Sequence, residues 1–598
     1  MKLFSSVADS SKTLLPVQNK QTRNHLGFVA YSCCTETVSN CDPKTKMSAS
    51  NVQESEVRIA HSLNMKEAAC VKKRRSEIWS SLKTLGINCS QDKVPNIALL
   101  GSGGGQRAMV GLLGSLDQLD KTGLLSCLLY LSGVSGSTWC MASLYQEPDW
   151  STKLQAVKEK IVRRISGPPV SWSDAYAKLK KYYREKEYFS LTDVWATMVV
   201  TTYVKEIDER TFTDWLGQSK NNPFPIYTLI DKECKQSGDG DPWFEISPCE
   251  AGYSLTGAFV KTPSFGSQFV NGRKTTSQPE MDMLLLQALC GSALADGEEN
   301  KKFLWSKIKG LFRHASDQMI EQMEQDPILQ QVDTCSDVLE ELAAINICLL
   351  DGEDPTTLDH SIRKSLKDLA GHDPQLISPD KSSEDEYTLE VCGLLEELQV
   401  KLNISWPVDL KMWIRIFVCM AKWTWGRNYD FLYNMRDPAV PAALLKSKTR
   451  DYEDAGLLLN SPYFSVLRTE RKIDIIISLD FSEGDPFQTV KEAAEACRKL
   501  KIPFPPINLL AEDIKNPKDF YVFKNTSTDK KAPTVIHIPL FNVINCGDKL
   551  GQYRKNYTTF QGAYSAEKII DLMNVAGKNI SNNKQELINV INEVIRKK

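Results

Sequence analysis

Short apolar runs alternate with amphipathic stretches along most of this chain. The clearest runs cover residues 97–100, 128–131, 473–480 and 534–539, and helix-like stretches lie between them. The run at 473–480 is nearly all apolar, as expected for a parallel strand covered on both faces. This alternation predicts an α/β domain from about Val94 onward, with a mostly parallel central sheet.

Two stretches depart from this pattern. Residues 1–75 are rich in Ser, Thr, Asn, Lys and Gln and have no sustained apolar period, so we expect them to be disordered. Residues 298–403 are acidic and are interrupted by Asp-Pro and Ser-rich turns, which predicts a helical insertion that caps the domain. The chain is therefore divided into a segment 1–75 and one large domain over 76–598.

Two glycine-rich turns follow predicted strands and precede predicted helices. The first is 101–107 (Gly-Ser-Gly-Gly-Gly-Gln-Arg) and the second is 133–137 (Gly-Val-Ser-Gly-Ser). A serine flanked by small residues at such a turn, here Ser135, is held with its hydroxyl exposed. A glycine run on a neighbouring turn can aim backbone N–H groups at a developing oxyanion. Together the two turns predict an acyl-transfer enzyme.

Glycine-rich turns also bind phosphates, so the alternative to an acyl-transfer site is a nucleotide-phosphate site at the first turn. No Gly-Lys-Ser/Thr follows the first turn, and Gln106 and Arg107 replace the third glycine of a dinucleotide fingerprint. The second turn ends in Ser137 where hydrolase elbows have glycine, so Ser135 taken alone is a weak signal. The two turns in this order favour chemistry over simple turn geometry.

A serine nucleophile needs a base that accepts its proton. Of six histidines, only His537 follows a candidate acid in the order Ser, Asp, His, but it lies inside a predicted strand and a core histidine is the favoured interpretation. Asp454, in an Asp-x-Gly turn, can act as the base directly. It can equally be an exposed turn residue, and the spacing does not decide between the two.

The motifs at 101–109, 133–137 and 454–456 together resemble the catalytic set of the group IV cytosolic phospholipases A2, which are related to patatin. Further matches occur in the same order at 225–227, 244–245, 265–267, 271–273, 425–426 and Arg471. The resemblance implies a three-layer α/β fold with a nucleophile elbow and a Ser/Asp dyad that needs no histidine, metal or cofactor. The roles it implies are nucleophile for Ser135, base for Asp454, oxyanion N–H donors for Gly104 and Gly105, and substrate-phosphate contacts for Arg107 and Arg471.

Most members of this family carry an N-terminal calcium-binding C2 domain, and residues 1–75 do not resemble one. The chain is similar in this respect to the gamma type, so we expect a calcium-independent phospholipase A2 with lysophospholipase and transacylase activity. The chain ends in Arg596–Lys598, without a prenylation box. The rival hypotheses are a histidine-dependent esterase and an idle lipid-binding protein. Intact Ser135, Asp454 and Arg107 argue against the second.

Composition limits the partners. The formal net charge of −2 gives no general attraction to nucleic acid. Sixteen cysteines without C-x-x-C pairs, and no signal peptide, indicate reduced thiols in the cytoplasm. No apolar run is long enough to span a bilayer, so contact with phospholipid membranes should be peripheral. The candidate contacts are Trp413–Trp425 and the basic runs 72–75 and 596–598. For the tryptophans a place in the core is the favoured interpretation. For the run 72–75 the favoured interpretation is the solvated start of a helix, with a lipid contact or a nuclear address as alternatives.

Overall fold

A computed structural model of the chain divides it into two units, Met1–Ser55 and Glu56–Lys598. The residues that the structure describes are 55–216, 221–295, 298–323, 326, 328–379, 381–525, 532–559 and 561–598. All elements named below belong to the second unit. The expected disorder of residues 1–54 lies outside the described residues.

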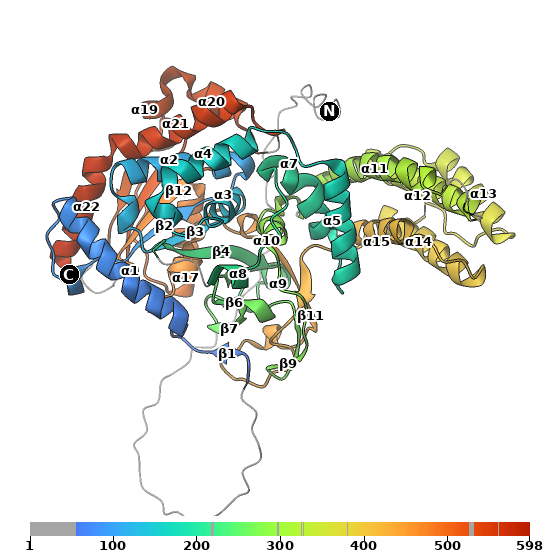
Figure 1. The fold of residues 1–598 in the computed structure, drawn as a ribbon, viewed down its shortest axis with the longest axis horizontal. Coiled ribbons are helices and arrows are strands. Elements are labelled where there is room, and N and C mark those ends of the chain that lie inside the picture. Colours follow the sequence, from blue (N-terminus) through green and yellow to red (C-terminus); the bar gives the residue numbers. More distant parts are fainter. Residues whose placement is uncertain are drawn as a thin grey trace, which may run out of the picture. The chain divides into compact units, whose positions relative to one another are not determined.

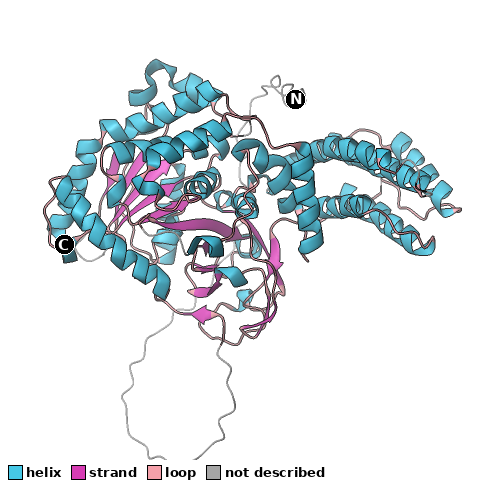
Figure 2. Ribbon diagram, in the orientation of Figure 1, coloured by secondary structure: helices cyan, strands magenta, loops and turns pink. Residues whose placement is uncertain are grey.

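A large mixed sheet forms the centre of the second unit, in the strand order β1-β7-β6-β5-β4-β3-β2-β12-β14-β13 (Figures 1 and 2). Its parallel part consists of β4 (Phe224–Asp231), β3 (Tyr130–Gly133), β2 (Ile97–Gly101), β12 (Ile475–Asp480) and β14 (Thr534–Pro539). The antiparallel part and its neighbours are β5 (Trp243–Ile246), β6 (Glu250–Tyr253), β7 (Ala258–Lys261), β1 (Arg58–Ile59), β13 (Tyr521–Phe523), β10 (Arg427–Tyr429) and β11 (Thr449–Asp454). Strands β8 (Gln268–Val270) and β9 (Arg273–Thr276) pair separately. The predicted mostly parallel α/β fold is confirmed.

Helices cover both faces of the parallel strands. The chain moves from β2 to β3 in one direction across the sheet and from β12 to β14 in the other. Because such crossovers are right-handed, α2 (Gly105–Lys121) and α17 (Gln488–Leu500) lie on opposite faces. Helix α21 (Ala566–Asn582) packs closely on α2, where a side chain at Gly114 would meet the backbone of Met573 at 2.4 Å. The result is a three-layer arrangement, and strand 475–480 is buried at every position.

The remaining α-helices are mostly short connections around the sheet. In chain order they are α3 (Gly136–Leu144), α4 (Leu154–Ile165), α5 (Trp172–Glu185), α6 (Leu191–Trp195), α7 (Thr201–Val204), α8 (Phe212–Leu216), α9 (Lys232–Ser237), α10 (Met283–Cys290), α16 (Tyr463–Val466), α18 (Ala511–Lys515), α19 (Val543–Cys546), α20 (Leu550–Asn556) and α22 (Lys584–Lys597).

Helix α1 (Met65–Thr84) begins before the boundary expected near residue 75. The Asn64 side chain accepts the Lys66 N–H and caps the helix. The apolar period is weak in this segment because two charged residues, Glu67 and Arg74, are themselves buried. Arg74 donates to the Leu128 carbonyl at 3.0 Å, so it is not free to meet a lipid surface. The expectation of disorder is therefore wrong for this part of residues 1–75.

Four helices occupy the acidic stretch 298–403. They are α11 (Glu298–Glu321), α12 (Leu329–Asp351), α13 (Thr356–Ala370) and α14 (Glu384–Lys401), and Figure 1 shows them beside α15 (Val408–Ala421). Aromatic residues join α11 to α15, with the rings of Phe312 and Trp413 5.2 Å apart. That these helices cap the catalytic site stays a prediction.

The tryptophans of 413–425 belong largely to the core. Trp413 and Trp425 are buried, and Trp413 donates through Nε1 to the Tyr176 hydroxyl at 3.1 Å. A contact with lipid is therefore wrong for Trp413 and Trp425, and the favoured core interpretation holds for them. At the other basic run, the Lys598 ammonium is paired with Asp474 at 2.6 Å. Within the described part of the chain, no helix combines the length and apolarity that crossing a bilayer requires.

Candidate active site

The two glycine-rich turns lie next to each other at the carboxyl ends of parallel strands. Gly101 at the end of β2 is the register partner of Gly133 at the end of β3. Helix α2 begins at Gly105 and helix α3 at Gly136, so both turns connect a strand directly to a helix. This strand–turn–helix arrangement agrees with the sequence prediction, and in parallel sheets it is where ligand sites form.

Ser135 has the strained backbone of a nucleophile elbow. Its φ of 51° and ψ of −126° lie in a region that non-glycine residues rarely adopt. Gly136 is necessary because an added Cβ would lie 1.8 Å from the Gly105 carbonyl oxygen. The two turns are therefore in direct backbone contact. Only 6% of Ser135 is exposed.

The pairing of β4 explains how Asp454 reaches this place. One edge of β4 pairs with β5. Along the other edge, β3 pairs with its first residues and ends with Gly133 opposite Tyr227. Strand β11 pairs with its last residues, antiparallel, and ends with Asp454 opposite Leu229. Since β3 and β11 run towards each other along one edge, their ends meet, and Ser135 and Asp454 come together.

Side chains fasten this junction. Val134, Ile230 and Ala455 form a small buried apolar cluster that joins the residue before Ser135 to the residue after Asp454. The Thr228 hydroxyl donates to the Gly133 carbonyl at 2.8 Å. The junction is therefore held by apolar packing and a hydrogen bond next to the two candidate catalytic residues.

Asp454 is a fully buried carboxyl group with few partners. Its Oδ1 accepts the Gly456 N–H at 2.8 Å, and its own N–H donates to the Ser292 hydroxyl at 3.1 Å. Its Oδ2 is buried and has no hydrogen-bond partner. The Ser135 hydroxyl favours the carboxylate form but does not reach hydrogen-bond geometry with it. Catalytic contacts often tighten only when substrate binds.

Burial controls the acidity of this group. It raises the pKa of Asp454 to about 7, against smaller lowering effects of the Gly456 N–H and the Ser135 hydroxyl. A base whose pKa lies near neutral pH suits proton transfer from a hydroxyl.

Gly104 and Gly105 have backbones that suit oxyanion binding. Their φ values of +147° and +55° favour glycine. Neither N–H has an acceptor among the residues that the structure describes, because α2 starts here without a side-chain cap. Gly103, the preceding residue, lies against the Ser135 side chain. The proposed oxyanion role is compatible with this geometry and stays a prediction.

Arg107 is buried and held by the protein itself. Its guanidinium donates to the Phe481 carbonyl at 2.7 Å, the Tyr557 carbonyl at 2.6 Å and the Thr559 hydroxyl at 3.1 Å. Among the described residues, its one well-exposed charged partner is Glu483, 3.4 Å away. Arg107 thus ties the first turn of α2 to two C-terminal segments.

Arg471 lies elsewhere. Its guanidinium is enclosed by Glu67, at 2.9 Å, and Glu245, at 2.7 Å. It also lies over the ring of Tyr130, the first residue of β3, whereas Ser135 follows the other end of that strand. This placement argues against the expected contact between Arg471 and a substrate phosphate. Its observed contacts are structural, joining α1 to β5.

His537 is not placed to serve Ser135. It lies in β14, and two strands, β12 and β2, separate it from β3. It is fully buried, its Nε2 lies 2.7 Å from the Pro486 carbonyl oxygen, and burial lowers its pKa. The core interpretation of this histidine agrees with the structure.

Two residues near the candidate pair Ser135 and Asp454 were not identified from the sequence. Ser292 accepts the Asp454 N–H, and Asn460 contacts both the glycine turn and the Asp454 turn. Asn460 stands in an Asn-Ser-Pro turn signal, but nothing local indicates which residues it meets. Among the described residues, no group of three or more His, Cys, Asp or Glu side chains is arranged to hold a metal ion.

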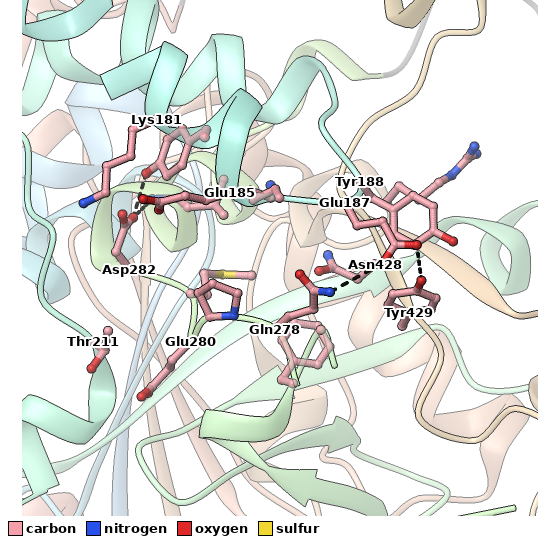
Figure 3. Close-up of a pocket in the computed structure, with 18 of the residues that line it drawn as sticks. Lys181, Glu185, Glu187, Tyr188, Thr211, Gln278, Glu280, Asp282, Asn428 and Tyr429 are labelled. Carbon is pink, nitrogen blue, oxygen red and sulfur yellow. Dashed lines mark hydrogen bonds between the residues drawn. The ribbon is translucent and has the colours of Figure 1, made fainter. Parts of the chain in front are cut away.

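A separate cavity of about 220 Å³ contains neither Ser135 nor Asp454 (Figure 3). It lies beside the end of α5, and its wall includes Lys178, which pairs with Glu209 at 2.6 Å and Asp282 at 2.7 Å. Tyr429 and Glu187 are bonded to each other on its other side. Much of its polar lining is therefore paired within the wall.

Comparisons with known proteins show the family of the chain. A family model described as a lysophospholipase catalytic domain matches residues 97–296. Cytosolic phospholipase A2 gamma of Mus musculus is 31% identical over 561 residues, which cover 88% of this chain and 90% of that protein. The Homo sapiens protein of the same name is 31% identical over 564 residues, covering 89% and 95%. The structure of human GIVD cytosolic phospholipase A2 superposes with a TM-score of 0.63 at 20% identity, covering 92% of this chain and 67% of that one.

Proposed function

The chain belongs to the cytosolic phospholipase A2 family and is a lipid hydrolase, and we propose that it releases fatty acids from glycerophospholipids through an acyl-serine at Ser135. The single observation that supports this best is the meeting of β3 and β11 along one edge of β4. It brings a strained serine and a buried, cation-free carboxyl group to the same point.

In the proposed reaction, Asp454 accepts the Ser135 proton as Oγ attacks the ester carbonyl carbon. The carbonyl π electrons move to oxygen, and the N–H groups of Gly104 and Gly105 stabilise the resulting oxyanion. Collapse breaks the ester bond, and the lysophospholipid leaves with the proton held by Asp454. Water then attacks the acyl-serine in the same way, which releases the fatty acid and restores Ser135.

The same intermediate accounts for the two further proposed activities. A lysophospholipid ester can acylate Ser135 as a diacyl lipid does, which is lysophospholipase activity. An alcohol in place of water takes the acyl group, which is transacylase activity. Each step uses groups of the chain alone, so we propose that calcium is not needed.

The membrane and phosphate contacts are part of the same proposal. We expect the enzyme to work in the cytoplasm at the surface of phospholipid membranes, because its substrates reside there. A substrate phosphate could reach Arg107 by displacing Glu483, its well-exposed partner. Such a contact would add a charge-assisted bond to a residue that already holds the glycine turn.

The test is fatty-acid release from vesicles of phosphatidylcholine labelled in one acyl chain, measured with calcium and with a chelator. Equal release in both conditions, and loss of about 10³-fold or more in Ser135→Ala, is expected. A fluorophosphonate should add to Ser135, which mass spectrometry detects. A strict requirement for calcium, or a fully active Ser135→Ala variant, would reject the proposal.

Two rivals give different results in this assay. A histidine-dependent esterase would lose its activity in His537→Ala, where we expect only a small decrease. An idle lipid-binding protein would bind the vesicles and release no fatty acid.

A further inference from the structure

Asn460 makes two hydrogen bonds to Gly103, the residue that precedes the proposed oxyanion donors Gly104 and Gly105. Its main-chain carbonyl accepts the Gly103 N–H at 3.1 Å, and its side-chain Nδ2 donates to the Gly103 carbonyl at 3.3 Å. Asn460 therefore bonds to both hydrogen-bonding groups of Gly103, and the Ser102 hydroxyl also donates to the Gly103 carbonyl, at 3.4 Å.

The second bond acts on the oxyanion donor itself. The Gly103 carbonyl and the Gly104 N–H belong to one peptide group, which is planar and trans. Because the N–H points away from the carbonyl across that plane, a bond that fixes the carbonyl also fixes the direction of the N–H. Asn460 is thus attached to the opposite end of a proposed catalytic dipole.

Asn460 is itself held between three strand ends. Its Nδ2 also donates to the Ser482 hydroxyl, beyond β12, at 2.9 Å. Its Oδ1 lies so close to the glycine turn and the Asp454 turn that a Cβ on Gly103 would be 2.3 Å from it, and one on Gly456 would be 2.9 Å from it. The side chain therefore connects the loops after β2, β11 and β12.

We infer that Asn460 is a positioning residue that orients the Gly104 N–H towards the oxyanion. The inference rests on the proposed function, since it assigns the oxyanion to this turn. It adds a side chain that does not touch the substrate, and whose loss weakens transition-state stabilisation more than substrate binding.

The expected effect is on kcat. Removal of one oxyanion donor costs roughly 10² to 10³ in kcat, and a misdirected donor should cost about 10- to 100-fold. In Asn460→Ala we expect this loss with little change in KM. A fatty trifluoromethyl ketone, which forms a tetrahedral adduct on the serine, should bind weaker by a similar factor. The acid limb of the pH profile should keep its midpoint near 7, because Asp454 is unchanged.

Controls separate positioning from general destabilisation. Asn346, buried in α12, donates to the Thr388 hydroxyl at 2.7 Å, and Asn346→Ala should lower stability without changing kcat per folded molecule. Ser482→Ala keeps the Gly103 bond and should cost much less than Asn460→Ala. If Asn460→Ala does not fold, Asn460→Asp keeps the shape but replaces the donor by an acceptor facing the Gly103 carbonyl, and should lose kcat in the same way.

The outcomes are distinct. Unchanged kcat in folded Asn460→Ala or Asn460→Asp overturns the inference, as does a loss of kcat with unchanged affinity for the ketone. A shifted pH midpoint in Asn460→Ala would place the action of Asn460 on Asp454 and also overturn the inference; the midpoint of Asn460→Asp is not used, because its added carboxylate lies beside the Asp454 turn and itself raises the pKa of Asp454. Ser135→Ala is assayed in parallel: if it is active, the proposed function falls and this inference with it, whereas an inactive Ser135→Ala with a normal Asn460→Ala rejects the inference alone.

Discussion

Two fully buried carboxyl groups in this molecule have opposite chemistry. Asp454 stands at the end of β11 with no cation bonded to it, and burial raises its pKa to about 7. Glu245 in β5 is equally buried, but Arg468 lies at 2.9 Å and Arg471 at 2.7 Å. Burial alone would raise the pKa of Glu245, and the two guanidinium groups outweigh it, so its pKa lies below the ordinary value.

The pairing of a buried carboxyl group with cations therefore decides whether it suits the role of a base, as proposed for Asp454, or a structural role, as for Glu245. A paired buried carboxylate is a poor base because its charge is already stabilised. An unpaired one holds its proton until near neutral pH and can exchange it with a hydroxyl. The missing cation at Asp454 is therefore the feature to test, and the ion pairs at Glu245 are its natural reference.

The largest effect should come from Asp454→Asn, which removes the base and keeps the shape. We expect fatty-acid release to fall by about 10³-fold or more, while the protein stays folded. A vesicle assay and circular dichroism check this. Substantial remaining activity would mean that another group accepts the Ser135 proton.

The same variant should be more stable than the parent at alkaline pH. The folded pKa of about 7 lies above the ordinary value of 3.8, so the folded state binds the extra proton between them. The stability of the parent therefore falls as pH rises through this window, and Asn does not share this loss. At pH 8 the free energy of unfolding of Asp454→Asn should exceed that of the parent by about 1 to 4 kcal/mol. Equal stability at pH 8 would show that Asp454 has an ordinary pKa.

Glu245→Gln should lower the stability of the protein and leave its activity unchanged, which is the opposite of what we expect for Asp454→Asn. The substitution removes the charge of one of the two glutamates that pair with each of the buried residues Arg471 and Arg468. Breaking a buried ion pair in this way typically costs about 3 to 5 kcal/mol of unfolding free energy. Activity per folded molecule should be preserved, because the site lies at the other end of β3. Urea denaturation with a parallel assay measures both quantities. A stable but inactive variant would place this network in the catalytic machinery.

The pH dependence of kcat/KM sharpens the comparison further. Only deprotonated Asp454 can accept a proton, so kcat/KM should rise with pH and level off above about 7. Two units below that midpoint the rate should be about 100-fold lower. Initial rates on a monomeric short-chain ester avoid changes in the vesicles. A midpoint near 4 would indicate a carboxyl group that is solvated when the enzyme works.

The smallest expected effect separates the two possible roles of Arg107. An ammonium group cannot make the bonds of the guanidinium to Phe481, Tyr557 and Thr559, so Arg107→Lys should slow hydrolysis of every ester. If a phosphate also binds there, the rate of phosphatidylcholine hydrolysis should fall about fivefold more than the rate for a p-nitrophenyl ester. Equal losses would limit Arg107 to holding the glycine turn.

The local strand–turn–helix units can be read from the sequence alone. Apolar runs followed by glycine turns predicted both strand–turn–helix units and the α/β class, and the strained elbow at Ser135 requires only small neighbours that are visible in the motif. These features depend on backbone conformation and period within a few residues, which local composition encodes.

Which charged and aromatic residues are buried depends on the folded chain. Glu67 and Arg74 look like solvent-exposed residues of a disordered segment, and Trp413 looks suited to a lipid surface, yet all three are buried. Arg471 resembles a phosphate ligand, but its partner Glu67 lies 404 positions away in the chain. The burial of a charge depends on such a distant partner, and only the folded chain brings it near.

The same holds for the dyad. Asp454 in its turn was as compatible with an exposed loop as with a base. The pairing of the strands distinguishes a buried base from an exposed turn residue. Strand β11 pairs with the edge of β4 beyond the point where β3 stops, so two chain segments separated by the whole helical insertion end at one buried point. Strand pairing over such a distance is set by the packing of the entire sheet, and it is this pairing that removes Asp454 from water and raises its pKa.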